Sequence, residues 1–310
     1  MRHHFSGMTA WACLATTALS GCAPGTVSSG TCQVVKLADL PVTFYENTPI
    51  VEVRINGQAA HLMLDTGASV TVLNEATTQT LNMAPDPLKS LLISGVGTFS
   101  AHRNAIASRL EIGDDRIFDV SLGVVALPYD PKRLYGGFIG TDILERYDLE
   151  LDEAHSRIGL YKPRNCPDGA SGLPGTPVLL TRPPGGLSLP TTAIAVKVNG
   201  QPLSAIIDSG ASGLAIDRAT TLRLGVAAND LAAGPKISSD VVGKTKVQST
   251  SHRFRSLGIG AVAFSNPTFH VVDLPNNGLY SRIDTLIGGS YLRHHRIWLS
   301  YGGHTAYVLD

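Results

Sequence analysis

The sequence predicts an all-β protein with a few short helices, built from two homologous lobes. Three observations support this fold class: many turn-forming residues, a repeat that spans most of the chain, and short apolar segments bounded by turns. Of the 310 residues, 32 are Gly and 18 are Pro, and only 16% are charged. Long amphipathic helices need more Glu and Lys than this, so the composition favours strands joined by turns.

The repeat relates residues 51–82 to residues 194–225 without a gap, and 12 of the 32 aligned pairs are identical. The separation between equivalent residues grows from 143 to 148 further along, so the second copy holds about five more residues. A whole lobe is therefore duplicated, unlike the short tandem units of solenoid proteins. Two later motifs recur in order, at Ile112-Gly113 and Ile259-Gly260 and at Phe138-Ile139-Gly140 and Leu286-Ile287-Gly288.

Each copy predicts the same opening hairpin. β-Branched strands are expected at Val51–Ile55 and Ala193–Val198. The pairs Asn56-Gly57 and Asn199-Gly200 follow, and both residue types tolerate the positive φ of a two-residue hairpin turn. The return strand of each copy then leads to an aspartate.

Short helices are expected next, at Asn74–Leu81 and Asp217–Leu224. Asn74 and Asp217 are good N-caps, and Gly225 suits the position just after a helix. Further strands are expected at Ser90–Ser94, Ala105–Ile112, Phe118–Val125, Val247–Ile259 and Thr268–Val272, and further helices at Asp142–Arg146 and Tyr291–His294.

The segment between the copies is dense in Pro and Gly and predicts a linker, in which a short strand near Val178–Leu180 can still lie. The chain is therefore expected to contain five parts. They are a signal peptide (1–21), an N-terminal tether (22–40), a first lobe (41–162), a Pro/Gly-rich linker (163–190) and a second lobe (191–310).

The N-terminus predicts export. Arg2 precedes an apolar stretch from about Met8 to Leu19, which is too short to span a bilayer as a mature helix. Leu19-Ser20-Gly21-Cys22 resembles a bacterial lipobox, in which Cys22 becomes the lipidated first residue. The alternative is an ordinary secretory signal with a chance cysteine. A lipobox implies a periplasm-facing envelope lipoprotein, and Ala23 after the cysteine indicates the outer membrane.

Two cysteines remain after Cys13 in the signal and Cys22 are set aside. Outside the cytoplasm, Cys32 and Cys166 are plausible disulfide partners, and a bridge would tie together the ends of the first lobe. The alternative is two free thiols.

Several functions are disfavoured. The net charge is zero and the pI is about 7.1, which argues against a nucleic-acid partner. His294-His295 lacks a carboxylate at ligand spacing, so we interpret these residues as packing or surface histidines. Gly258-Ile259-Gly260 is only a fragment of a dinucleotide-binding fingerprint.

Two acidic turns carry the functional prediction: Asp65-Thr66-Gly67-Ala68-Ser69 and Asp208-Ser209-Gly210-Ala211-Ser212. They resemble the active-site loops of aspartic proteases of the pepsin and retropepsin clan, and residues 138–144 are close to the retropepsin form of a second motif. A lone Asp-Thr-Gly is weak, but two copies, each followed by an apolar-Ile-Gly element, are specific. The resemblance covers about Pro41 to the C-terminus. It implies a bilobal aspartic-protease fold, with two retropepsin-like β-barrel lobes and the active site between them.

The resemblance implies that Asp65 and Asp208 are the catalytic pair. Two adjacent carboxylates cannot both ionise cheaply, so they share one proton. The ionised group takes a proton from a bound water, and the protonated group hydrogen-bonds the scissile carbonyl. Which aspartate is protonated at rest is left open, because the two groups titrate together.

The neighbouring residues are expected to support this pair. Thr66 and Ser209 would hydrogen-bond across it, Gly67 and Gly210 would allow the tight turns, and Gly140 and Gly288 would let a second loop pass close beneath. Ala68 and Ala211 stand where pepsin-like enzymes place a hydroxyl group that lowers the carboxyl pKa. Their presence predicts activity at mildly acidic to near-neutral pH.

A substrate-binding flap is expected at Gly95, Val96, Gly97 and Thr98, with a second-lobe counterpart at Val242–Thr245. The alternative is two ordinary glycine turns. Neither tip carries the tyrosine typical of the pepsin flap. Substrate would lie extended and pair its backbone with such a hairpin.

Three functions remain from this sequence. The leading hypothesis is a monomeric aspartic endopeptidase that acts on extended polypeptide in the cell envelope, without cofactor or metal. The second is a non-catalytic peptide-binding lipoprotein, and the third is a structural envelope lipoprotein. The duplicated acidic loops disfavour both alternatives, because a buried acid pair lowers stability without serving binding or scaffolding.

Overall fold

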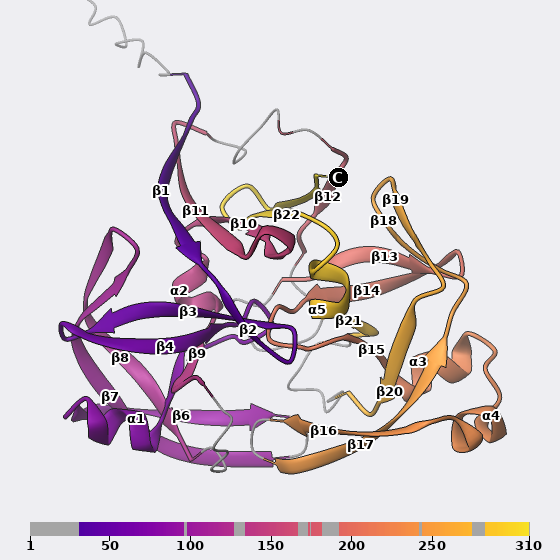
Figure 1. The fold of residues 1–310 in the computed structure, drawn as a ribbon, viewed down its shortest axis with the longest axis horizontal. Coiled ribbons are helices and arrows are strands. Elements are labelled where there is room, and N and C mark those ends of the chain that lie inside the picture. Colours follow the sequence, from indigo (N-terminus) through magenta and orange to yellow (C-terminus); the bar gives the residue numbers. More distant parts are fainter. Residues whose placement is uncertain are drawn as a thin grey trace, which may run out of the picture. The chain divides into compact units, whose positions relative to one another are not determined.

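The structure is a computed structural model of the chain. It describes residues 31–95, 98–126, 134–166, 173, 175–181, 192–241, 244–274 and 283–309. The predicted signal peptide and Cys22 lie outside these residues. The described part is mostly β with a few short helices, as predicted (Figure 1). None of its helices has the length and apolar character needed to cross a membrane.

The first lobe is a closed six-stranded barrel, because β3 pairs with β7 at the seam of the sheet. Its two helices are α1 (Glu75–Thr80) and α2 (Thr141–Leu144). The strand order is β2 (Thr43–Tyr45), β3 (Thr48–Ile55), β4 (Gln58–Leu64), β9 (Gly137–Ile139), β5 (Val72–Asn74), β8 (Asp115–Val125), β7 (Thr98–Ile112) and β6 (Ala84–Gly95).

The second lobe repeats this strand order, but the strands equivalent to β7 and β8 are each divided into two. The sequence predicts one strand over Val247–Ile259, but the structure divides it into β17 and β18. The break faces Asn266-Pro267, where Asn266 has a φ of 53° and Pro267 offers no N–H to a ladder, so both neighbouring strands stop. The order is β16 (Lys236–Val241), β17 (Lys244–Arg253), β20 (Thr268–Val272), β15 (Leu214–Asp217), β21 (Thr285–Ile287), β14 (Gln201–Ile207), β13 (Ile194–Val198), β18 (Ser256–Ile259) and β19 (Val262–Ser265).

The helices of the second lobe are α3 (Arg218–Arg223), α4 (Ala228–Ala233) and α5 (Gly289–Leu292). Helices α3 and α5 correspond to α1 and α2. Helix α4 has no counterpart in the described part of the first lobe and accounts for extra residues in the second copy.

Local sequence explains the turns and caps. Asn56 and Gly57 have φ of 52° and 83°, and Asn199 and Gly200 have φ of 51° and 81°, as a two-residue hairpin turn requires. The side chain of Asn74 accepts a hydrogen bond from a backbone N–H at the start of α1, and Asp217 does the same for α3. The predicted hairpin turns and N-caps are therefore confirmed.

A third sheet joins the two lobes (Figure 1). Its central strands pair antiparallel, with Leu149 opposite Leu299 and Glu150 opposite Trp298. Glu150 and Trp298 are 148 residues apart, so the pseudo-two-fold axis of the repeat passes between them. The strand order is β1 (Gln33–Pro41), β11 (Arg157–Arg164), β10 (Asp148–Asp152), β22 (Ile297–Ser300), β23 (Thr305–Val308) and β12 (Pro177–Leu179).

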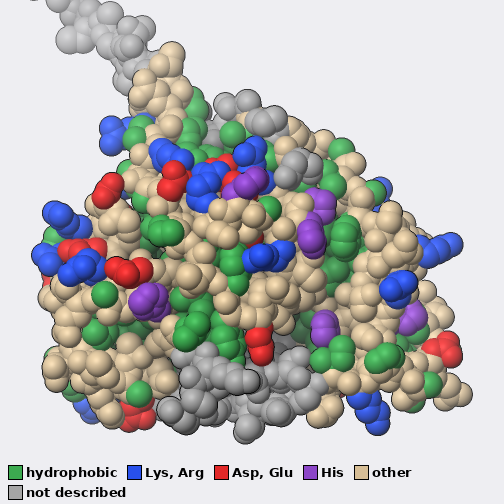
Figure 2. Space-filling view, in the orientation of Figure 1, with side chains coloured by type: hydrophobic (Ala, Val, Ile, Leu, Met, Phe, Trp, Pro, Cys, Tyr) green, Lys and Arg blue, Asp and Glu red, His purple; other side chains and the backbone are tan. Residues whose placement is uncertain are grey.

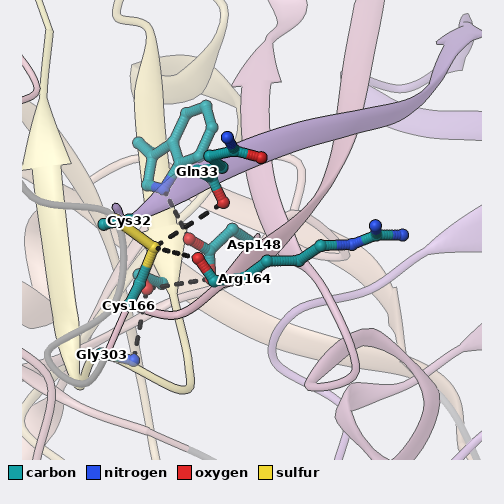
Figure 3. The surroundings of a disulfide bond; sticks show 8 residues. Cys32, Gln33, Asp148, Arg164, Cys166 and Gly303 are labelled. Atoms are coloured by element: carbon teal, nitrogen blue, oxygen red, sulfur yellow. Dashed lines mark hydrogen bonds between the residues drawn. A yellow bond between two sulfur atoms is a disulfide. The ribbon is translucent and has the colours of Figure 1, made fainter. Parts of the chain in front are cut away.

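This sheet uses segments that the sequence analysis places outside both lobes. Strand β1 lies largely in the expected tether and β12 lies in the expected linker. A disulfide joins Cys32, just before β1, to Cys166, just after β11 (Figure 3). It closes a separation of 134 residues, so the edge strand β1 is covalently held to its neighbour.

Candidate active site

Each candidate aspartate stands at the end of a core strand and is anchored by the Ile-Gly motif of its own lobe. Asp65 follows β4 and Asp208 follows β14. The backbone N–H of Asp65 donates to the carbonyl of Ile139 at 3.0 Å, and that of Asp208 donates to Ile287 at 3.0 Å. The repeat therefore holds both aspartates in the same backbone environment.

The two carboxyl groups meet between the lobes. Each carboxyl group lies against the glycine of the other loop, and the two groups interact electrostatically. A Cβ atom placed on Gly67 would lie 2.5 Å from Oδ1 of Asp208, and one placed on Gly210 would lie 2.5 Å from Oδ2 of Asp65. Real Cβ contacts are longer than this, so each loop needs glycine where it passes the carboxyl group of the other lobe.

Burial raises the pKa of both carboxyl groups. The backbone N–H groups of Gly67 and Ala68 oppose this rise at Asp65. At Asp208 the negative charge of Asp65 adds to burial and holds the pKa well above its usual range. Because the groups are coupled, these shifts describe a pair that retains one proton to higher pH than an isolated carboxyl would.

Two hydroxyl groups lock the loops together across the lobe boundary, as predicted for Thr66 and Ser209. Oγ1 of Thr66 donates to the carbonyl of Ile207 at 2.6 Å, and Oγ of Ser209 donates to Leu64 at 2.6 Å. Each oxygen also accepts the backbone N–H of the other residue, at 3.1 and 3.0 Å. Both side chains are buried, so these bonds are shielded from water.

In each lobe, the loop at the Ile-Gly motif passes directly beneath the aspartate loop. A Cβ atom on Gly140 would lie 2.6 Å from the carbonyl oxygen of Val70, and one on Gly288 would lie 2.5 Å from that of Ala211. Both glycines are therefore required by close backbone approach, which is the role that the sequence analysis assigns to them.

Ala68 and Ala211 reach the aspartates through their backbones. The N–H of Ala68 donates to Oδ1 of Asp65 at 2.9 Å, and the N–H of Ala211 donates to Oδ1 of Asp208 at 3.1 Å. Their methyl groups offer no further donor, so the expected pH range of activity stays a prediction.

The sequence analysis did not predict a set of hydrogen bonds that supports the Asp65 loop from below. Oδ1 of Asp142 accepts hydrogen bonds from N and Oγ1 of Thr71 at 2.8 and 2.7 Å, and Thr71 Oγ1 in turn accepts the N–H of Gly140 at 3.0 Å. In the second lobe, Ser290 Oγ accepts the N–H of Leu214 at 3.1 Å. A polar residue stands two positions after the glycine of each Ile-Gly motif, and this shared position is the sequence signal for the support.

The expected flap falls at the tip of the β6–β7 hairpin, where Gly95 pairs with Thr98. Val96 and Gly97 lie outside the described residues, as do Val242 and Gly243 of the counterpart. The hairpin position agrees with a flap, and its role stays a prediction.

No group of three or more His, Cys, Asp or Glu side chains suited to a metal occurs within the described residues. His295 instead stacks on Tyr291, with ring centroids 4.1 Å apart, which matches our interpretation of a packing residue.

Family models assign the same class of protein to both lobes. The model described as "gag-polyprotein putative aspartyl protease" matches residues 51–146, and the model described as "Aspartyl protease" matches residues 194–291. The chain therefore contains two retropepsin-like aspartyl protease domains, one in each lobe. A search of the curated proteins finds no match to this chain.

Proposed function

We propose that the chain is an aspartic endopeptidase that hydrolyses peptide bonds with a water held between Asp65 and Asp208. The observation that carries this proposal is the pair of buried, interacting carboxyl groups, each packed against the glycine of the other lobe's loop. Aspartic proteases are the reference case for such a proton-sharing pair.

The chemistry uses the pair as one acid and one base. The ionised carboxylate removes a proton from the water, whose oxygen attacks the peptide carbonyl carbon while the protonated carboxyl hydrogen-bonds the carbonyl oxygen. The tetrahedral intermediate then collapses, the C–N bond breaks, and the leaving nitrogen receives a proton. The Thr66 and Ser209 bonds hold the two carboxyl groups in register, so little reorganisation is needed during the reaction.

One copy of the chain supplies both aspartates, so we propose a monomeric enzyme. An extended polypeptide across the pair can add a strand to the β6–β7 hairpin, whose ladder ends at Gly95 and Thr98. This supports a polypeptide substrate rather than a small molecule.

We propose that the enzyme works in the cell envelope, facing the periplasm, and is held at the membrane by lipid on Cys22 or else is secreted. The lipobox-like residues 19–22 support this location. The Cys32–Cys166 disulfide also supports it, because such bonds persist in oxidising compartments.

The test compares the purified native chain with Asp65→Asn and Asp208→Asn. The matched control is Asp273→Asn, which changes an exposed aspartate paired with Arg218. Each protein is incubated with a diverse peptide mixture from about pH 3 to 8, and cleavage is read by mass spectrometry while circular dichroism reports folding.

We expect the native chain and Asp273→Asn to cleave and both site variants to lose cleavage while staying folded. Absence of cleavage by a folded native chain at every pH would contradict the proposal and favour a peptide-binding role. Cleavage that survives in the site variants would place the activity elsewhere.

A further inference from the structure

A row of side chains crosses the outward face of the second barrel, beginning beside Asp208. The backbone carbonyl of Ile287 accepts a hydrogen bond from the N–H of Asp208. The preceding residue, Leu286 of β21, is paired with Ala215 of β15. Ala215 is in turn paired with His270 of β20. Leu286, Ala215 and His270 are all half-buried. Their neighbours along the strands point the other way, since strand residues alternate between faces. These core-facing neighbours are Ile216, Phe269, Val271 and Ile287.

The equivalent row in the first lobe is apolar. Phe138 pairs with Val72, and Val72 pairs with Gly123, which therefore occupies the position of His270. Phe138 and Val72 form a small apolar cluster that packs against Ala68 and Val70 of the aspartate loop. The equivalent positions on the two sides of the aspartates thus differ. Those of the first lobe are apolar and buried, and those of the second are half-buried and include an imidazole.

The imidazole of His270 lies against the end of the second aspartate loop. Its Nε2 would lie 3.3 Å from a Cβ atom on Gly213, and the hydroxyl oxygen of Ser290 is 3.7 Å from the same point. Nδ1 is buried and has no hydrogen-bond partner among the described residues. Burial lowers the pKa of His270, and no carboxylate in the described part of the chain opposes this effect. Figure 2 shows that histidine side chains lie scattered over this face of the molecule.

We propose that His270 is a specificity-determining residue that binds a carboxylate side chain of the substrate, an Asp or Glu on one side of the scissile bond. This inference rests on the proposed peptidase function. From β21 to β20 is two strand spacings, or roughly 10 Å, and an extended chain advances about 3.3 Å per residue. The acidic residue therefore lies within about three residues of the cleaved bond.

A substrate carboxylate would bind the Nε2 side of the half-buried ring, because the buried Nδ1 is closed to a substrate. An imidazole can offer an N–H to a carboxylate, and the pairing becomes stronger when the ring is protonated. A half-buried site also strengthens the interaction relative to open water. The competing explanation is that the ring only fills the space above Gly213, where the first lobe has Val70.

The experiment first finds cleavage sites of the native chain in a peptide library and then uses three peptides that differ at one position, carrying Glu, Gln or Leu. Native chain, His270→Leu and His252→Leu are compared by kcat/KM. Leucine keeps the space filled but removes the imidazole. His252 lies on the adjacent strand β17, outside the row, and packs edge-on against Phe254, so it is the matched control.

We expect the native chain and His252→Leu to prefer Glu over Leu by about tenfold, the size of a hydrogen bond to a charged group, and His270→Leu to lose that preference. The inference is overturned if the native chain cleaves but shows no Glu preference, if Gln serves as well as Glu, or if His270→Leu keeps the preference. A native chain that cleaves nothing contradicts the peptidase function itself, which separates the two failures.

Discussion

Glu153 and Tyr301 occupy equivalent places in the two lobes, 148 residues apart, each directly after the central strand of its half. Both are buried, with 0% and 7% of their surface exposed. Glu153 lies within electrostatic reach of Arg293 of the second lobe, and Tyr301 lies within reach of Glu145 of the first. Arg293 and Glu145 are again 148 residues apart. The repeat has thus placed two different titratable groups at one symmetric position beneath the lobe boundary.

This relationship predicts that Glu153 makes the fold less stable as the pH rises. Burial raises its pKa from 4.5 to about 8, and neither carboxyl oxygen has a hydrogen-bond partner among the described residues. The folded state holds this proton more tightly than the unfolded state. Its contribution is therefore complete below about pH 4.5 and is lost as the pH rises to about 8, at up to about 1.4 kcal/mol per pH unit.

The measurement is thermal unfolding of native chain and Glu153→Gln between pH 4 and 9. We expect the variant to show a shallower loss of melting temperature between pH 5 and 8, and Glu52→Gln, on an exposed side chain, to behave like the native chain. Identical slopes for native chain and Glu153→Gln would contradict the prediction. The aspartate pair contributes in the same direction in all three proteins, so the difference isolates Glu153.

The hydroxyl bonds between the loops should contribute strongly to stability. In Thr66→Val, the carbonyl of Ile207 and the N–H of Ser209 lose their partner in a buried place. We expect a loss of about 2–4 kcal/mol in the free energy of unfolding, measured by urea denaturation. Thr80→Val, on the exposed face of α1, should lose less than about 1 kcal/mol. Equal losses in the free energy of unfolding would contradict the prediction that the bonds across the lobe boundary contribute more than an exposed hydrogen bond.

A hydroxyl group introduced beside the aspartate pair should move the activity to lower pH. In Ala68→Ser, a new donor near Asp65 would stabilise the ionised form and lower the pKa of the pair. We expect the acidic limb of the kcat/KM profile to shift downward by roughly one unit. Ala76→Ser, on helix α1, is the control. An unchanged profile in a folded, active Ala68→Ser variant would contradict the explanation that the missing hydroxyl at position 68 keeps the pKa of the pair high.

Reduction of the disulfide should loosen the edge of the joining sheet. The bond closes a separation of 134 residues and holds β1 to β11. We expect a reducing agent to lower the stability of the native chain by about 2–5 kcal/mol, seen as a fall in melting temperature. The variant Cys32→Ser/Cys166→Ser should already be less stable and should not respond to the reducing agent. A native chain that melts at the same temperature under both conditions would contradict this role.

The sequence predicts the two barrels well because their signals are local. Asn-Gly turns, N-caps such as Asn74 and the Asp-Thr/Ser-Gly loops each need only a few neighbouring residues. The repeat then confirms each element by showing it twice. The pairing of Asp65 with Asp208 followed from the family resemblance, not from any pattern in one lobe.

The joining sheet was not predicted, for a physical reason. Strands such as β10 and β22 are short and lie against partners from the other half of the chain. The short strand expected near Val178–Leu180 is present as β12, but its pairing with β23 could not be read from a segment rich in Pro and Gly. No local pattern encodes such long-range pairing. Glu153 was missed likewise, because nothing in its neighbours marks a buried carboxyl group.

The pseudo-two-fold axis between Glu150 and Trp298 has a consequence for how recognition can change. In a symmetric homodimer, any substitution appears on both sides of the axis at once. Here the two halves are covalently one chain, so His270 can stand on one side while Gly123 stands on the other. Duplication has freed each side of the aspartate pair to vary by itself, so one substitution can change the chemistry of one side and leave the other side as it is.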